Sequence, residues 1–372
     1  MMSSPTHSAA PEAGTNAAAA AEFGMDMHNM VHEYIKDLNP RTKEIVVKRF
    51  GLDGKKPRTL EQIGRSYGIT RERVRQIQAG AMKDFRQSED LSVLSPIESI
   101  LENIIVERGN IMRHDHVLDV FADRTPGEVN PYVVEFVLEL SNRFTHHPET
   151  ELTHRAWATE QGDLDVPTQV INAFITSLQD SGEPLPHDAT VKCVLDHDEA
   201  ETYCHVVTDG EIVASYLAIS KKVRQNPFGE WGLTEWTEIS PKGVKDKAYV
   251  ILKKAGDPLH FTDITERINA SGLAKRPAIP QTVHNELIKD ERFVLVGRGI
   301  YALREWGYEP GTVADVAARV LKNAGGTLSR DEIVDEVLKQ RMVKKNTVLL
   351  ALQDKDRFKK HKDGMFELLN NN

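Results

Sequence analysis

Four polar residues, Arg71, Glu72, Arg75 and Gln76, fall together on one side of the first two turns of a predicted helix. Their side chains suit the edges of DNA bases, because arginine can read guanine, glutamate can accept from cytosine and glutamine can pair with adenine. A helix that enters the major groove presents residues near its N-terminus to the bases. The spacing therefore favours a DNA-reading helix. The simpler interpretation of such a charged run is a face that contacts only solvent.

The segment that would position these side chains, residues 59–86, has the spacing of a helix-turn-helix. Thr59 and Thr70 are suited to begin two helices as N-caps, and Gly68 is suited to end the first because glycine tolerates positive φ. Apolar residues at helical spacing would form the face between the two helices. They are Leu60, Ile63, Tyr67, Val74, Ile77, Ala81 and Phe85.

The positive charge of the chain is concentrated around this segment. Residues 41–86 hold thirteen Lys and Arg against five Asp and Glu, although the 372-residue chain has a net charge of −9. A basic region of this kind is typical of nucleic-acid binding, whereas the acidic remainder favours protein partners or self-regulation. We expect phosphate attraction from Arg41, Lys55, Arg58 and Lys83.

Residues 38–86 resemble region 4 of the sigma-70 family of transcription initiation factors, through LNPRTKEIVVKRFGLDG, TLEQIG, GITRERVRQI and KDFR. The resemblance implies that the helix-turn-helix recognises a promoter −35 element and docks on the flap of the RNA polymerase β subunit. It implies base contacts for Arg71, Glu72 and Gln76, and backbone or activator contacts for Arg73 and Arg75. Thr70 is expected to join the backbone contacts. Four apolar residues could hold the flap, although filling the core is the stronger interpretation: Ile45, Val46, Phe50 and Leu52.

Three positions depart from the family pattern. Thr42 and Gln78 stand where acidic residues are usual, and Gly80 weakens its helix by about 1 kcal/mol relative to alanine. These departures bear on fine base specificity rather than on the fold. The −10-melting region 2 of the family has no counterpart before Leu38, so we expect that the protein does not open promoters alone. Residues 1–24 are Ala-rich and are predicted to form a disordered tail.

The rest of the chain repeats with a period of about 70 residues. Turn glycines follow four similar helices, at Gly109, Gly182, Gly256 and Gly325. In each repeat a third helix is expected to begin near Asn130, Gly210, Pro280 or Lys345, before two apolar strands around a turn. We therefore predict a mainly α protein with small β wings. It comprises a helix-turn-helix at 25–90 and four tandem winged-helix units at 91–160, 161–240, 241–308 and 309–372.

Residues 244–306 resemble the HARE-HTH family of winged-helix modules, which occur in the δ subunit of RNA polymerase and in chromatin and restriction proteins. The residues that carry the resemblance are Ala248, Ile251, Leu252, Pro258, Leu259, the FTDITERI helix, Val283, Leu287 and RFVLVGRGIYAL. The resemblance implies attachment to transcription or DNA-associated machinery. Basic residues of the last two units could touch phosphates or lie on a solvated face. They are Lys275, Arg276, Lys289, Arg292, Arg298, Lys339, Arg341, Lys344, Lys345, Lys359 and Lys360.

Other chemistry finds little support in the sequence. No phosphate-binding loop, nucleophile elbow or HExxH helix occurs, so we expect neither an enzyme nor a cofactor. Cys193, His197, Cys204 and His205 lack the spacing of a zinc site, and a core cysteine on a strand is the better interpretation. With two cysteines, no signal peptide and no membrane-length apolar run, we expect a cytoplasmic, nucleoid-associated protein.

These patterns together predict a transcription regulator that binds double-stranded DNA and the RNA polymerase core. Two alternatives remain open. One is a polymerase-binding accessory or inhibitor of initiation that reads no DNA sequence. The other is an accessory of DNA modification or restriction in which the winged units read DNA. The sequence does not determine the oligomeric state. It also does not decide between activation and repression.

Overall fold

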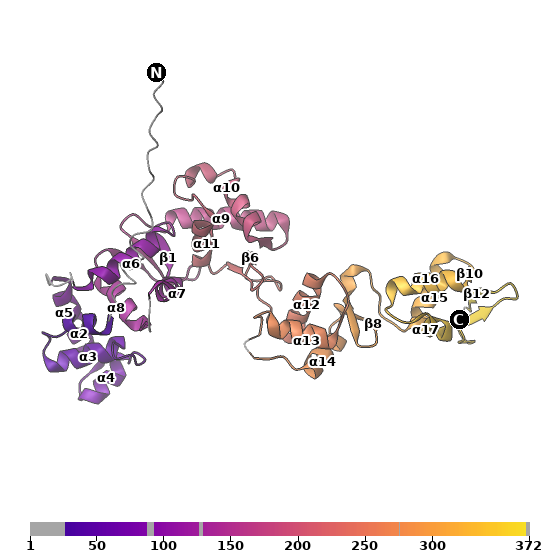
Figure 1. The fold of residues 1–372 in the computed structure, drawn as a ribbon, viewed down its shortest axis with the longest axis horizontal. Coiled ribbons are helices and arrows are strands. Elements are labelled where there is room, and N and C mark those ends of the chain that lie inside the picture. Colours follow the sequence, from indigo (N-terminus) through magenta and orange to yellow (C-terminus); the bar gives the residue numbers. More distant parts are fainter. Residues whose placement is uncertain (1–26, 88–92, 126–128, 275, 370–372) are drawn as a thin grey trace, which may run out of the picture. The chain divides into compact units, whose positions relative to one another are not determined.

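The computed structural model describes residues 27–87, 93–125, 129–274 and 276–369 (Figure 1). The predicted tail at residues 1–24 lies outside this part of the chain. The protein forms two compact units, Met1–Arg224 and Gln225–Asn372. Both consist mainly of helices with short strands, as the sequence predicted. The boundary between the units falls inside the segment 161–240.

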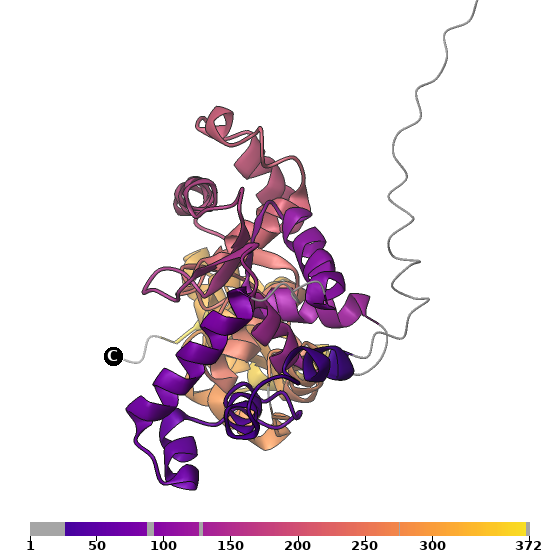
Figure 2. The same ribbon diagram turned by 90° about the vertical axis from the view of Figure 1, so that its left-hand side faces the viewer.

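Residues 27–87 of the first unit, whose indigo and violet ribbons are at the front in Figure 2, form four helices. They are α2 (Met27–Tyr34), α3 (Pro40–Phe50), α4 (Leu60–Tyr67) and α5 (Arg71–Gln87). Helix α4 begins with a capping box in which Thr59 and Gln62 each accept from the backbone amide of the other. It ends at Gly68, where φ is 64°. Helices α4 and α5 lie on either side of the turn at Gly68, so the predicted helix-turn-helix is confirmed.

The first winged helix follows directly. Its elements are α6 (Ser95–Val106), β1 (Ile111–Arg113), α7 (His114–Arg124), α8 (Pro131–Leu140), β2 (Phe144–His147) and β3 (Ala156–Thr159). The strands form an antiparallel sheet in the order β1-β3-β2. Strand β1 thus pairs with the far strand of the hairpin, and this is the arrangement expected of a winged helix.

One continuous apolar core joins the helix-turn-helix to this winged helix. Helix α8 packs against α2, α3 and α5. The buried ring of Phe136 in α8 lies 5.0 Å from the ring of Phe50 and 6.1 Å from that of Phe85, between centroids. Arg86 donates to the carbonyl of Glu139 at 2.7 Å. Segments 25–90 and 91–160 therefore share a core, although their sequences suggested separate modules.

The second repeat has the same order of helices. It contains α9 (Asp165–Ser181), β4 (Leu185–Pro186), α10 (His187–Leu195), the 3-10 helix η2 (Ala200–Thr202), α11 (Gly210–Ile219), β5 (Val223–Gln225) and β6 (Glu230–Leu233). Helix α9 ends at Gly182 with φ of 69°. Cys193 lies in α10 and is half-buried, and Cys204 is exposed. The prediction of a core cysteine on a strand is therefore wrong, because a helical and not a strand period governs this segment.

The third repeat matches the predicted winged helix closely. It consists of α12 (Val244–Ala255), β7 (Leu259–His260), α13 (Phe261–Ala270), α14 (Pro280–Lys289), β8 (Phe293–Gly297), β9 (Ile300–Leu303) and the 3-10 helix η3 (Arg304–Trp306). The strands run antiparallel in the order β7-β9-β8. Ala248, Leu252 and Val283 are fully buried in its core, as their spacing predicted.

The fourth repeat has a core of its own. It contains α15 (Val313–Ala324), β10 (Leu328–Ser329), α16 (Arg330–Gln340), α17 (Lys345–Ala351), β11 (Phe358–Lys360) and β12 (Met365–Leu368). The strand order is β10-β12-β11. Helix α15 ends at Gly325, where φ is 66°. The turn glycines of the repeats adopt positive φ throughout, which explains why the sequence repeats glycine there.

Candidate nucleic-acid interface

The turn between α4 and α5 sets the direction of α5, which carries the four predicted base readers. The amide of Ile69 donates to the carbonyl of Gly64 at 3.0 Å. A Cβ added to Gly64 would lie 2.6 Å from the carbonyl oxygen of Ile69, so this close approach requires glycine. Thr70 directly precedes helix α5, and its hydroxyl accepts from the amide of Arg73 at 3.1 Å. The predicted N-cap of α5 is therefore present.

A small apolar cluster holds α4 and α5 together beneath the polar face. Ile45, Ile63 and Val74 are completely buried and form its centre. Partly buried residues pack around them: Leu60, Tyr67, Ile69 and Ile77. Ala81 and Phe85 are also buried but belong to the core shared with α8. The apolar residues predicted to face inward from α5 therefore belong to two different cores, with Val74 and Ile77 in the first and Ala81 and Phe85 in the second.

All four predicted base readers are exposed on the outward face of α5. Arg75 makes a bidentate pair with Glu72: Nε donates to Oε2 at 2.9 Å and Nη2 donates to Oε1 at 2.7 Å. This pair lowers the pKa of the Glu72 carboxyl and raises the pKa of the Arg75 guanidinium. Both side chains therefore remain charged, and their mutual bonds occupy the groups that base reading would use.

The other two base readers differ in how they are held. Gln76 accepts from Nη1 of Arg73 at 3.2 Å. Arg71 makes no side-chain hydrogen bond or ion pair within the described residues, so its guanidinium can meet a base without first leaving a partner. Arg71 is therefore the side chain best prepared to bind guanine bidentately.

The residues expected at phosphates are all exposed: Arg41, Lys55, Arg58, Thr70, Arg73 and Lys83. Arg41 lies 5.9 Å from the centre of the Tyr67 ring, and Lys55 pairs with Asp53 at 3.5 Å. These contacts are weak because they are open to water. Several positively charged side chains therefore remain accessible to a phosphate backbone.

Gln78 has a positioning role that the sequence did not reveal. Its amide oxygen accepts from Nε of Arg49 at 3.2 Å, which ties α5 to α3. Arg49 also donates to the carbonyl of Arg58 at 3.5 Å. Gln78 lies 29 positions after Arg49, so no local sequence pattern predicts this contact. One of the departures from the family pattern is thus used to hold the reading helix in place.

The four residues considered for polymerase contact are buried in the folded protein. Ile45 and Val46 are 0% exposed, Leu52 is 1% and Phe50 is 8% exposed. Within described residues 27–87, no large apolar side chain is exposed. Val46 and Phe50 belong to the core shared with the winged helix, where α8 packs against α3. A flap contact through this apolar set would require the core to open, so the core interpretation holds.

Two of the arginines considered for phosphate contact in the last repeats have structural roles. Arg292 pairs with Asp290 at 2.8 Å and with Asp246 at 2.9 Å. Arg341 is 3% exposed and donates to the carbonyls of Glu309 and Gly311 at 2.7 and 3.0 Å. Arg341 is therefore too deeply buried to contact a phosphate, whereas Arg292 stays half-buried and is held by two aspartates. Lys275 lies outside the described residues.

The described residues contain no group of three or more His, Cys, Asp or Glu placed to hold a metal ion. None of the helices in the described ranges combines the length and apolar character that a membrane span needs.

Two segments of the chain match known families. Residues 34–87 match the model for sigma-70, region 4. Residues 243–306 match the model for HARE-HTH, a helix-turn-helix domain whose description names ASXL and restriction endonuclease proteins. Both agree with the segments singled out in the sequence. Recognition of the two families is therefore confirmed.

Two curated relatives are RNA polymerase sigma factors. RpoD of Neisseria gonorrhoeae is 37% identical over 75 residues, which is 20% of this chain and 12% of that protein. SigA of Clostridium acetobutylicum is 41% identical over 69 residues, which is 18% of each chain. The matches thus span less than a fifth of either relative and concern the helix-turn-helix.

Proposed function

We propose that this chain regulates transcription by binding a promoter −35-like duplex through the outward face of α5, in association with RNA polymerase. The observation that carries the proposal is the exposure of all four base readers at the N-terminal end of a helix held by a helix-turn-helix core. The similarity to sigma-70 region 4 supports the same assignment. The protein would act by binding rather than by catalysis.

DNA binding would proceed in two parts. The exposed cations around α5 would attract the duplex without regard to sequence. Arg71 would then read a base directly, while Arg75 would exchange its bonds to Glu72 for bonds to a base. The exposed position of both partners makes this exchange inexpensive.

Association with polymerase would use a surface other than the buried apolar residues Ile45, Val46, Phe50 and Leu52. The winged-helix repeats are the proposed site, because one of them matches HARE-HTH. The family description of that match includes restriction endonucleases, and it supports a second candidate function as an accessory reader of modified DNA.

The first test is selection of bound sequences from a randomised duplex library by the full chain. We expect enrichment of one short motif, and measured affinity at least about tenfold higher for the selected duplex than for its scrambled version. If no motif is enriched, base reading by α5 is wrong. Enrichment only from a library of methylated duplexes would favour the second candidate.

The polymerase part is tested separately by purifying the tagged chain from its own cells after nuclease treatment. Core RNA polymerase retained in near-stoichiometric amount would support the association. If polymerase is retained while no DNA motif is selected, the chain is a polymerase accessory that does not read DNA.

A further inference from the structure

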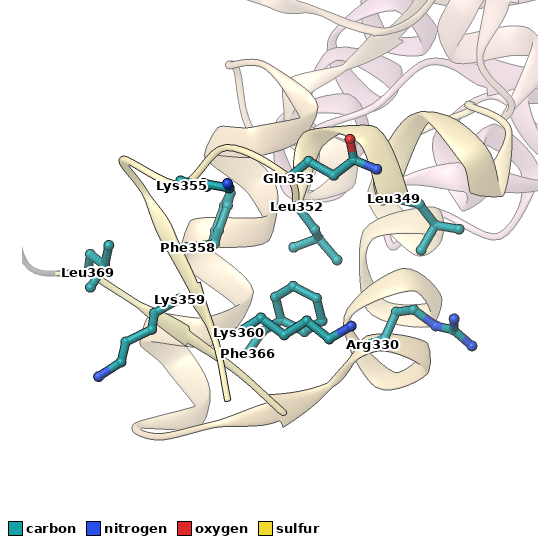
Figure 3. Close-up of a pocket in the computed structure, with 10 residues that line it drawn as sticks. All are labelled: Arg330, Leu349, Leu352, Gln353, Lys355, Phe358, Lys359, Lys360, Phe366 and Leu369. Carbon is teal, nitrogen blue, oxygen red and sulfur yellow. The ribbon is translucent and has the colours of Figure 1, made fainter. Parts of the chain in front are cut away.

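A groove in the fourth repeat combines an apolar floor with a basic rim (Figure 3). Its volume is about 770 Å³, within the range of sites that bind ligands. The groove lies between α17 and the wing strands β11 and β12. Its lining residues are Arg330, Leu349, Leu352, Gln353, Lys355, Phe358, Lys359, Lys360, Phe366 and Leu369.

The floor of the groove belongs to the core of the repeat. Leu352, Phe358 and Phe366 are buried there, with exposed fractions of 4%, 3% and 7%. Leu349 and Leu369 are half-buried and lie at its sides. A ligand that enters would therefore meet aliphatic groups and ring edges, which favour an apolar side chain.

The rim carries four cations, and no acidic residue lines the groove. Lys360 lies 5.9 Å from the centre of the Phe366 ring and extends past it toward Arg330 in Figure 3. Arg330 shares Asp331 with Lys345, at 3.4 and 3.1 Å. Lys355 and Lys360 form no ion pair with the acids of the described residues. This concentration of like charge stands out in a chain whose net charge is −9.

We propose that this groove binds an acidic amphipathic peptide segment of a protein partner. A leucine or phenylalanine of the peptide would fill the space over Leu352 and Phe358. Its aspartates or glutamates would pair with Lys360 and Lys355 on the rim. The apolar floor is what such a peptide needs, and the charge of the rim is complementary to it.

Nucleic acid fits the groove less well. Stacking on bases, which single-strand binding requires, needs an exposed ring face, and Phe358 and Phe366 are only 3% and 7% exposed. A duplex meets a protein through its phosphates and groove edges, and neither gains from an apolar floor. The site is independent of the helix-turn-helix, so the inference extends beyond the proposed DNA reading.

The test uses the full chain and a phage-displayed library of random peptides about twelve residues long. The groove variant is Lys355→Glu with Lys360→Glu. The matched control is Lys322→Glu with Lys362→Glu, two exposed lysines of the same repeat that do not line the groove. Both variants change the net charge equally. Thermal unfolding of each variant checks that the fold is intact, and Lys360→Gln serves as a milder second variant.

We expect selected peptides that combine several Asp or Glu with Leu or Phe. A synthetic peptide of this kind should bind the groove variant about tenfold more weakly than wild type and the control about equally. Replacing its Leu or Phe by Ser should also abolish binding. Equal affinity for the two variants, or selection of peptides without acidic residues, would overturn the proposal. So would a comparable loss of duplex affinity confined to the groove variant, because the rim would then be a DNA surface.

Discussion

At the scale of single residues, the outward face of α5 is organised by pairs of its own side chains. Arg75 donates to Glu72 and Arg73 donates to Gln76 in the free protein, and all four side chains are exposed. Only part of the polar face is therefore immediately available to a base. Arg71 at the start of the helix is the exception within the described residues, so its contribution is expected to be the most direct.

Arg71→Ala combined with Gln76→Ala should lower discrimination between selected and scrambled duplexes by about 1–3 kcal/mol per contact, because base-edge contacts carry sequence information. Lys83→Ala should weaken binding to all duplexes alike and reduce the salt dependence by about one ion, because its proposed contact is with a phosphate and not with a base. Fluorescence anisotropy over a range of salt concentrations measures both. Equal losses on both duplexes for both variants would contradict this division of roles.

A second prediction at this scale concerns Asp290 in the third repeat. Bonds from Arg292 lower the pKa of its carboxyl from an ordinary value of 3.8 to about 2. Because the pKa is lower in the folded protein, ionised Asp290 stabilises the fold above about pH 4, and this contribution is lost as the pH falls toward about 2. Asp290→Asn should therefore reduce the free energy of unfolding near neutral pH but have little effect at the acid end of this range.

Urea unfolding of the two proteins across this pH range measures the difference. Asp335→Asn, on the exposed face of α16, serves as the control and should change little at either pH. A difference between wild type and Asp290→Asn that stays constant with pH would show that the ion pair with Arg292 does not stabilise the fold.

At the scale of elements, two glycines within the helix-turn-helix differ in the space that surrounds their Cα atoms. Gly80 lies inside α5, and a Cβ there would meet no atom within 4 Å. Gly64 lies inside α4 against the carbonyl of Ile69. The first glycine costs helix stability without a packing reason, whereas the second allows α4 and the turn to approach.

Gly80→Ala should raise the free energy of unfolding by about 0.5–1 kcal/mol, because alanine favours the helix and the space is open. Gly64→Ala should lower it by about 1–3 kcal/mol, because the added methyl group must displace backbone. Chemical denaturation of the full chain gives both values. The two glycines lie in adjacent helices, so each variant controls for the other. A gain in stability from Gly64→Ala would contradict the close packing around Gly64, and a loss from Gly80→Ala would contradict the open space at Gly80.

At the scale of the whole molecule, helix α8 makes the helix-turn-helix part of a larger folding unit. Phe136 contacts both Phe50 of α3 and Phe85 of α5, and the winged helix thereby completes the core beneath α5. The region similar to sigma factors is thus held by residues that lie outside the similarity.

Phe136→Ala should destabilise both parts together, by about 3–5 kcal/mol, because it leaves a cavity in the shared core. Hydrogen exchange detected by mass spectrometry should show faster exchange in α3 and α5 as well as in α6 and α8. A fragment of residues 27–87 alone should fail to fold, since it would expose Phe50 and Phe85. Cooperative unfolding of that fragment at the stability of the full chain would contradict a shared core.

The local sequence determined the helix-turn-helix and the order of helices in the repeats. Thr59, Gly68 and Thr70 set the ends of α4 and α5 through contacts with residues a few positions away. Glycine recurs at the turns of the repeats because each of these turns needs a positive φ. Apolar spacing likewise located Val74 and Phe85 on the inner face of α5. The exposure of Arg71 followed from the same periodicity. Such features are predictable because each depends on the residue and its immediate neighbours.

Tertiary structure alone decided what these elements contact. The burial of Phe50 and Val46 depends on α8, which lies far along the chain, so an apolar stripe could be read either as core or as a partner surface. The bond between Arg49 and Gln78, and the burial of Arg341 under carbonyls of another segment, also join distant residues. A single sequence records periodicity but not which surfaces meet, and those meetings determine which polar and apolar groups remain accessible to a partner.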